Sequence, residues 1–509
     1  MILDPRSPKG RGLFVVWRIP CNEQGEPGIE GVIANENLNF RINHTQEENM
    51  KRFWLVMLSL GLIIAFSSTA MAVDVKFSGE FYAGGMYLDK TNLTKSTTGG
   101  DPSTAFYFQR LRARTDFTIS PGLTLITRLD AMERAWGATR SATGTALAVD
   151  SAGTVAENEN IAIDWVYIDY KSAIGTFLVG YMNYGSTGTI FGNSSAPQAR
   201  IRFNRMFGPI NVWASISKVK ENSKTAINPV PPATADSDND VYHLEGIYSW
   251  KSGRAGLNVN YYNYANTRPP AVPAANGSYR RTYFLFTPYL MAKFGPVSVQ
   301  AEFNYLNGTD KYEDGVVKAA GVDKVTLENI SAYLDATANF GMFYAGGSIA
   351  YVSGDDPDSK DKTEGGLING GRDWNPCLIM FSYYDRAKWA GNLTGYGTSV
   401  DNGQMANAWF FQLRGGVKPV EKLDVMASVS YAFADKKPWN TANNPATEYL
   451  NDDYGWEVDL TATYKITNNL SYMVGAGYLF TGKYYQANVA VNNELTDDFL
   501  VINKLTLTF

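Results

Sequence analysis

The chain has 509 residues with 45% apolar and 19% charged side chains and a formal net charge of −5, which excludes an intrinsically disordered protein and a strongly basic nucleic-acid binder. A mean hydropathy of −0.22 excludes a bundle of membrane-spanning helices. Two cysteines and two histidines leave little material for disulfides, thiolate metal sites or histidine-based catalysis. We therefore expect no cofactor, no metal and no enzymatic activity.

The first apolar segment of the chain is predicted to be a secretory signal peptide at residues 50–72. Lys51 and Arg52 precede an apolar run over 53–66, and the small residues that end at Ala72 suit signal peptidase. The run is too short for a membrane-spanning helix. Residues 1–49 show no helix or strand rhythm and would place the signal peptide inside the chain, so we interpret them as an unstructured leader and Met50 as the true start.

Residues 73–509 alternate apolar and polar side chains with a period of two, which predicts β-strands. Segments 108–119, 297–305 and 456–466 are the clearest examples. The strands run to about ten residues or more, the length that a tilted strand needs to cross a bilayer. Their apolar faces begin or end in aromatic residues, as interfacial girdles do.

Tight turns and long polar stretches alternate along this part of the chain. Seven predicted turns each contain Pro, Gly or Asn. They lie at 120–122, 207–209, 251–253, 294–296, 340–341, 418–421 and 467–469. The long stretches lie near 89–103, 137–160, 184–198, 221–240, 267–280, 308–325, 354–405, 436–453 and 483–496. This asymmetry predicts an all-β transmembrane antiparallel barrel of about 18 strands (16–18), with short periplasmic turns and long extracellular loops.

If the apolar sides of these strands face lipid, charged side chains must face the interior, since an arginine costs roughly 2–4 kcal/mol at the midplane of a barrel. We predict pore-lining basic residues on the first strands, and acidic residues dispersed around the wall. The basic set is Arg110, Arg112, Arg114, Arg128, Arg200 and Arg202, and the acidic set is Glu80, Asp130, Glu302, Asp335, Glu457 and Asp459. Such rows either form a charged constriction or pair as salt bridges that stiffen the wall.

Other polar-face residues leave further alternatives open. Inward aromatics could guide sugars or merely fill the wall; they are Tyr82, Trp213, Tyr262, Tyr264, Tyr283, Tyr289, Tyr333 and Phe410. The apolar segment 370–381 within the longest loop either folds into the barrel or forms an extracellular cap. We interpret Cys377 as a small buried hydrophobe and His243 as a solvated wall residue.

The last strand, 499–509, ends in an alternating pattern with a terminal Phe509. This ending resembles the C-terminal signal that the barrel-insertion machinery reads. Together, the signal peptide, strand rhythm, loop asymmetry and terminal Phe resemble the Gram-negative outer-membrane porin family over residues 73–509. The resemblance implies a homotrimer in outer-membrane lipid and lipopolysaccharide, with a loop folded into each pore.

The resemblance implies passive diffusion of small hydrophilic solutes and ions through a water-filled pore, and the early arginines favour tolerance of anions. The first alternative is a substrate-specific channel for sugars or oxyanions. The second is a barrel that acts as a sleeve for an electron-transfer partner. A plugged active transporter and an autotransporter are disfavoured, because strand alternation begins at Val75, directly after the signal peptide.

Overall fold

The computed structural model describes residues 73–95, 102–137, 161–184, 188–221, 238–265, 279–312, 321–440, 447–449, 451–487 and 494–509. The predicted leader and signal peptide lie outside these residues, as do parts of most predicted loops. The long strands are β1 (Asp74–Leu88), β2 (Thr104–Ser120), β3 (Leu123–Ala135), β4 (Ile161–Ser172), β5 (Gly175–Asn183), β6 (Pro197–Phe207), β7 (Ile210–Lys220), β8 (Asn239–Trp250), β9 (Gly253–Tyr264), β10 (Tyr279–Phe294), β11 (Val297–Tyr312), β12 (Lys324–Phe340), β13 (Phe343–Val352), β17 (Ala408–Val420), β18 (Leu423–Ala434), β21 (Asp453–Lys465), β22 (Leu470–Thr481) and β23 (Asp498–Thr508).

The shorter elements lie in the connections between these strands. They are β14 (Lys362–Thr363), η1 (Tyr383–Ala387), α3 (Lys388–Ala390), β15 (Leu393–Thr394), β16 (Val400–Asp401), β19 (Trp439–Asn440), β20 (Thr447–Glu448) and η2 (Lys483–Gln486). In the described part of the chain, no helix has the length and apolar character needed to cross a membrane.

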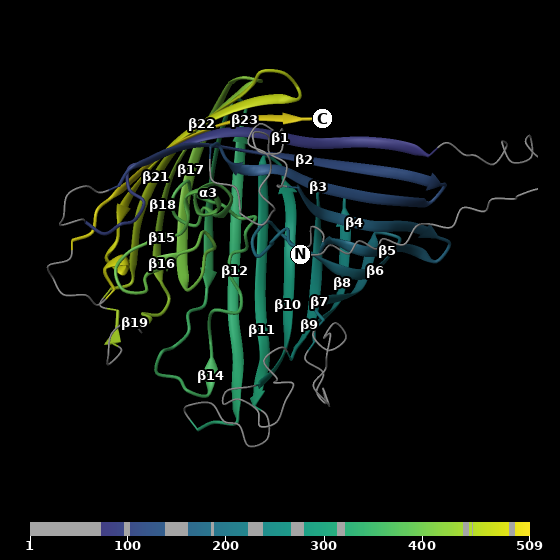
Figure 1. Ribbon diagram of the computed structural model, residues 1–509, viewed down its shortest axis with the longest axis horizontal. Helices are drawn as coiled ribbons and strands as arrows, with labels where there is room; N and C mark the ends of the chain where they lie inside the picture. Colours follow the sequence, from purple (N-terminus) through teal and green to yellow (C-terminus); the bar gives the residue numbers. More distant parts are fainter. Residues whose placement is uncertain are drawn as a thin grey trace, which may run out of the picture. The chain divides into compact units, whose positions relative to one another are not determined.

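The long strands form one closed antiparallel barrel. Each pairs with its neighbours in chain order, and β1 also pairs with β23 from Glu80↔Thr508 to Leu88↔Leu500. Figure 1 shows β23 and β1 side by side. Apart from β14, which pairs parallel with β12, eighteen strands of the described sheet make up the wall. The predicted fold class and the predicted strand number are therefore confirmed.

The connections divide into two kinds, as the turn residues predict. Among the described residues, seven turns contain two residues between strands and an eighth, between Lys465 and Leu470, contains four. Glycines in several of these turns adopt positive φ, for example Gly122 at 81° and Gly341 at 65°. One of the eight, between Ser172 and Gly175, is not among the predicted turns, because Ala173 and Ile174 carry no turn signal.

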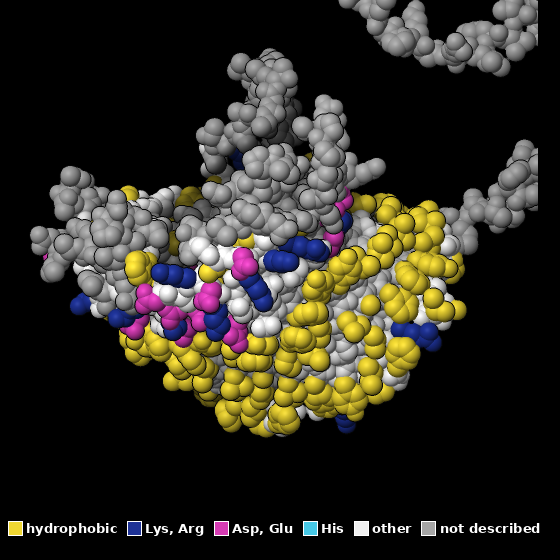
Figure 2. All heavy atoms as spheres, turned by 90° about the horizontal axis from the view of Figure 1, so that it is seen from below, with side chains coloured by type: hydrophobic (Ala, Val, Ile, Leu, Met, Phe, Trp, Pro, Cys, Tyr) yellow, Lys and Arg dark blue, Asp and Glu magenta, His cyan; other side chains and the backbone are white. Residues whose placement is uncertain are grey.

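Alternating exposure distinguishes the two faces of the wall. On β21, Leu460 is 55% exposed whereas its neighbours Glu457 and Asp459 are buried. Figure 2 shows apolar side chains covering much of the surface seen from below, with charged side chains gathered along one margin. A large exposed apolar surface of this kind is costly in water and typical of a wall in contact with lipid.

The terminal residue joins the two ends of the barrel. The N–H of Gly79 donates to the carbonyl of Phe509 at 2.8 Å, and the N–H of Phe509 donates back to the carbonyl of Gly79 at 3.0 Å. A Cβ at Gly79 would lie 2.7 Å from the ring of Phe509 and 2.4 Å from the carbonyl oxygen of Arg112. Only glycine therefore leaves room for the terminal ring against the first strand.

This close approach generates a prediction. We expect Gly79→Val to destabilise the barrel by about 1–3 kcal/mol, because the added methyl groups collide with backbone and ring atoms that hold the closure. The measurement is the midpoint of urea unfolding in detergent. Gly246→Val is the matched control, since a Cβ at Gly246 meets no heavy atom within 4 Å. Equal midpoints for the two variants would contradict the role of Gly79.

Candidate functional site: the barrel interior

Two long connections fold inward and contact the inner wall. In the loop after β5, the N–H and the hydroxyl of Thr189 donate to Glu302 on β11 at 2.7 and 2.9 Å. In the connection between β13 and β17, residues 353–407, the N–H groups of Ile379 and Met380 donate to Glu457 on β21 at 2.6 and 2.7 Å. Each loop is thus fixed by an inward carboxylate that accepts backbone donors.

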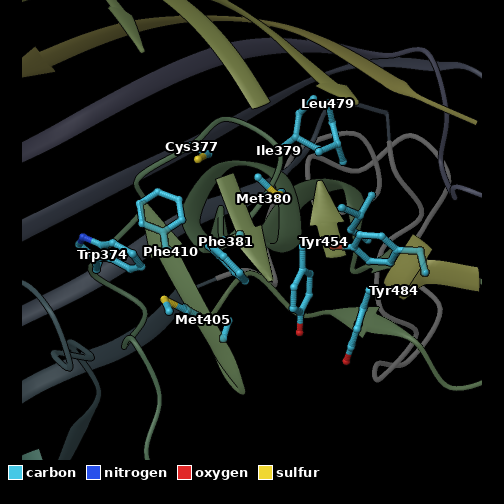
Figure 3. Close-up of a cluster of buried hydrophobic side chains, with 14 of the residues drawn as sticks. Trp374, Cys377, Ile379, Met380, Phe381, Met405, Phe410, Tyr454, Leu479 and Tyr484 are labelled. Carbon is cyan, nitrogen blue, oxygen red and sulfur yellow. The ribbon is translucent and has the colours of Figure 1, made fainter. Parts of the chain in front are cut away.

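The segment 370–381 folds into the barrel, which decides between the two alternatives that the sequence left open. The ring of Trp374 packs edge-on against that of Phe410 on β17, with the ring centroids 5.2 Å apart. The ring centroid of Phe381 lies 5.7 Å from that of Tyr454 on β21. Figure 3 shows these side chains gathered around Met380 and Met405. Because both wall aromatics point inward, the loop fills part of the lumen with a small hydrophobic core of its own.

Charged groups are buried inside this loop. Asp401 accepts from the N–H groups of Phe381 at 2.8 Å and Gly403 at 2.7 Å, and burial raises the pKa of Asp401 to about 6. Burial also lowers the pKa of Arg386, whose guanidinium lies 3.9 Å from a carboxylate oxygen of Asp498. The thiol of Cys377 is fully enclosed, and burial raises its pKa well above the ordinary range. The prediction of a buried, unreactive Cys377 agrees with this environment.

The predicted arginines on β2 and β3 lie beside carboxylates on the inner wall. Arg110 donates to Glu80 at 3.0 Å, and Arg112 makes a bidentate contact with Asp130, both distances being 2.6 Å. Two further partners were not predicted. Arg114 pairs with Asp116 at 2.7 Å, and Arg128 pairs with Asp164 on β4.

A β-bulge explains why sequence periodicity missed Asp164. The pairing of β3 with β4 shifts register between Arg128 and Leu129. Ile163 is outward before this point and Val166 is outward after it. Asp164 and Trp165 can therefore both meet Arg128, whose guanidinium lies 3.4 Å from the centroid of the Trp165 ring.

Arg200 and Arg202 on β6 have a different environment, in contact with aromatic rings. Arg200 lies 4.5 Å from the ring centroid of Tyr184, and Arg202 lies 3.4 Å from that of Trp213. Within the described ranges neither guanidinium has a carboxylate at ion-pair distance. Both are buried, and they do not line the two cavities described below.

The predicted acidic residues are spread around the wall. Asp335 pairs with Arg414 of β17 at 2.8 Å, an arginine that the sequence analysis did not single out. Glu457 and Asp459 point inward, but residues 377–380 cover them. Six residues of the predicted set border the two cavities described below; they are Glu80, Arg110, Arg112, Arg114, Arg128 and Glu302.

Two cavities lie in the described interior. One, of about 620 Å³, is bordered by charged side chains, namely Glu80, Arg110, Arg112, Arg114, Arg128, Asp373 and Lys504. The other, of about 490 Å³, is bordered mainly by amides and aromatic rings; they include Asn183, Asn258, Asn260, Asn304, Trp165, Tyr184 and Tyr262. Both share four lining residues, Arg128, Trp165, Ser195 and Asp373.

The shared boundary is formed where the two inward loops meet. The N–H and hydroxyl of Ser195 donate to Asp373 at 3.1 and 2.8 Å, and Tyr384 donates to the same carboxylate at 2.9 Å. Asp373 and Arg128 thus both lie at the boundary. Neither Ser195 nor Asp373 follows a period-two pattern from which it could be predicted. The geometry defines a barrel with two polar chambers in contact through a loop-built boundary.

A lipid-facing barrel with a polar, loop-narrowed interior defines the class of outer-membrane channels. The family model described as Gram-negative porin matches residues 59–413, and the chain belongs to this family. It is an outer-membrane porin, as the resemblance predicts. Among curated proteins, none matches the chain.

Several solved structures are similar to this chain at low sequence identity. OccK9 (OpdG) of Pseudomonas aeruginosa is 14% identical with a TM-score of 0.47, over 86% of this chain and 99% of its own. OpdQ of the same organism is 12% identical with a TM-score of 0.46, over 86% of this chain and 98% of its own. The outer-membrane channel DcaP of Acinetobacter baumannii is 12% identical with a TM-score of 0.39, over 87% of this chain and 99% of its own.

The anchor of the loop after β5 can be tested. We expect Glu302→Ala to leave the buried N–H of Thr189 without its acceptor, at a cost of about 1–3 kcal/mol, and so to release the loop. The measurement is single-channel current, where we expect larger open-channel noise and a shifted conductance. Glu328→Ala, which removes a more exposed carboxylate paired with Lys362, is the control. Unchanged current noise in the Glu302 variant would refute the anchor.

Proposed function

We propose that this porin conducts small hydrophilic solutes by passive diffusion through the two chambers and favours anions. The observation that carries the proposal is the lining of the larger chamber, where four arginines and Lys504 face two carboxylates, Glu80 and Asp373. A polar lining lets hydrated solutes pass and disfavours apolar ones. The small volume of each chamber limits passage to small molecules.

The arginines keep a positive face toward the chamber although they are paired. The carboxylates that hold Arg112 and Arg114 lie behind them. The side chain of Arg112 is 26% exposed against 11% for Asp130, and that of Arg114 is 35% exposed against 24% for Asp116. None of these partner carboxylates borders the cavity. At Arg112 and Arg114 a passing solute therefore meets the guanidinium group before its partner, whereas at Arg110 the partner Glu80 is the more exposed group, at 38% against 11%. This arrangement supports both interpretations of the predicted arginine row, internal salt bridges and a charged lining.

The second chamber favours one alternative, a channel specific for sugars. Amides beside aromatic rings are the groups that bind hydroxyls and the faces of sugar rings. Tyr184 donates to Asn260 at 2.5 Å and Trp165 donates to Asn183 at 2.9 Å, so the lining is held in place. A sleeve around an electron-transfer protein finds no support, because inward loops divide the described interior into chambers of small-molecule size.

Ion selectivity tests the proposed function. In a planar bilayer between unequal concentrations of KCl, we expect a reversal potential that indicates chloride preference. We expect Arg128→Gln to reduce the chloride-to-potassium permeability ratio at least twofold, since Arg128 borders both chambers. Arg205→Gln is the matched control, because Arg205 is an exposed residue that borders neither chamber. A cation preference in the unmodified protein would reject the anion assignment, and sub-millimolar block by one sugar would favour the specific channel.

We further propose that the mature protein begins at Val73, after removal of the signal peptide 50–72, and that translation starts at Met50. The terminal Phe509 is proposed as the signal for the barrel-insertion machinery, and a homotrimer surrounded by lipid and lipopolysaccharide as the assembled form. The family supports these assignments, since porins are exported proteins of the outer membrane.

Native mass spectrometry of the detergent-solubilised protein checks processing and assembly together. We expect a chain mass that corresponds to residues 73–509 and an assembly of three chains. A chain that retains any of residues 1–49 would contradict the start at Met50. A single-chain species at all detergent concentrations would contradict the trimer and leave the processing result unaffected.

A further inference from the structure

Away from the two chambers, three potential metal ligands converge where the inward loop meets the wall. Cys377 comes from the loop, and Glu457 and Asp459 come from the inner face of β21. One ligand atom from each of the three lies within 4.8 Å of the others. All three residues are at most 5% exposed.

One carboxylate oxygen in this group has no hydrogen-bond partner. Both oxygens of Glu457 accept backbone N–H groups of the loop. Asp459 receives the hydroxyl of Ser428 on Oδ2 at 3.4 Å, whereas its Oδ1 receives none, although the residue is only 3% exposed. A buried carboxylate oxygen without a donor is costly, and a second carboxylate beside it increases the cost.

A glycine on the neighbouring strand β22 lies directly against the point where the carboxylates converge. A Cβ built on Gly477 would lie 2.6 Å from Oδ1 of Asp459 and 3.5 Å from Oε1 of Glu457. Any other residue would fill this position.

Among the described residues, no lysine, arginine or histidine forms an ion pair with Glu457 or Asp459. The one arginine of the loop core, Arg386, is oriented toward Asp498 at 3.9 Å. Within these residues the two carboxylates therefore have no ion-paired basic side chain, and both side chains are buried beside each other. A bound cation would supply the missing charge.

We propose that Cys377, Glu457 and Asp459 bind a divalent cation of the zinc class and so fasten the inward loop to β21. A thiolate together with two carboxylates is a donor set that suits zinc, whereas calcium and magnesium prefer oxygen donors alone. Binding would release the proton of Cys377 and the proton that Glu457 and Asp459 share, which leaves the site with three negative donors around a doubly charged ion. This site goes beyond the channel function and does not depend on it.

Cobalt provides a spectroscopic probe of the same site. The full-length protein, refolded in detergent with Co²⁺, is expected to bind one ion per chain and to show a thiolate-to-cobalt charge-transfer band that Zn²⁺ abolishes. Cys377→Ser should remove the band, and Asp459→Asn should weaken binding at least tenfold. Gly477→Ala keeps all three ligands but fills the space between the carboxylates, and it should also weaken binding.

Two controls keep the outcome clear. Asp310→Asn changes a buried carboxylate of β11 that pairs with Arg281 of β10, and this variant should bind cobalt like the unmodified protein. Heat-dependent mobility on gels verifies that each variant is a folded barrel. If the unmodified protein binds no more cobalt than Cys377→Ser, or shows no thiolate band, the metal site is refuted and the two carboxylates share a proton instead. Zn²⁺ should raise the thermal midpoint of the unmodified protein and leave that of Cys377→Ser unchanged.

Discussion

Closure of the sheet between β1 and β23 is the constraint on which the rest of the structure depends. In hydrocarbon no water can satisfy an unpaired backbone N–H or carbonyl, so an antiparallel sheet in a membrane must have no free edge. The ladder from Glu80↔Thr508 to Leu88↔Leu500, extended by the two hydrogen bonds between Gly79 and Phe509, provides that closure. The closed wall then determines an inside and an outside for every residue along each strand.

Closure encloses an interior that either side chains or water must occupy. In this protein a loop fills one part of the interior, and polar side chains border cavities in another part. On one side the 353–407 connection brings its own apolar core into the lumen, with Trp374 and Phe381 packed on inward aromatics of the wall. Its backbone donors are satisfied by carboxylates, Glu457 and Asp401. On the other side the wall keeps polar side chains and borders two chambers. The loop thus occupies part of the interior that a barrel of eighteen strands encloses.

Electrostatics inside the barrel follow from the same geometry. Arginines that would be costly toward lipid are placed inward, where carboxylates and aromatic rings hold them in fixed positions. Arg128 illustrates both kinds of contact, with Asp164 on one side and the face of Trp165 on another. Fixed charges of this kind act on a passing ion more strongly than mobile ones, because little reorganisation is needed when the ion arrives.

The sequence by itself determined the barrel class, the strand number and the inward direction of the arginine row, because alternation with a period of two is a local property of each strand. It did not predict the turn at Ser172, where no turn residue occurs, nor the Asp164–Trp165 bulge, which breaks the local period. Only the tertiary structure decided that segment 370–381 folds inward, that Asp373 and Arg128 border the same two cavities, and that Glu457 and Asp459 lie beneath the loop beside Cys377. These contacts join residues that are far apart in the chain. They depend on how the loop packs inside the closed wall, and the pattern of residues within a single strand does not predict that packing.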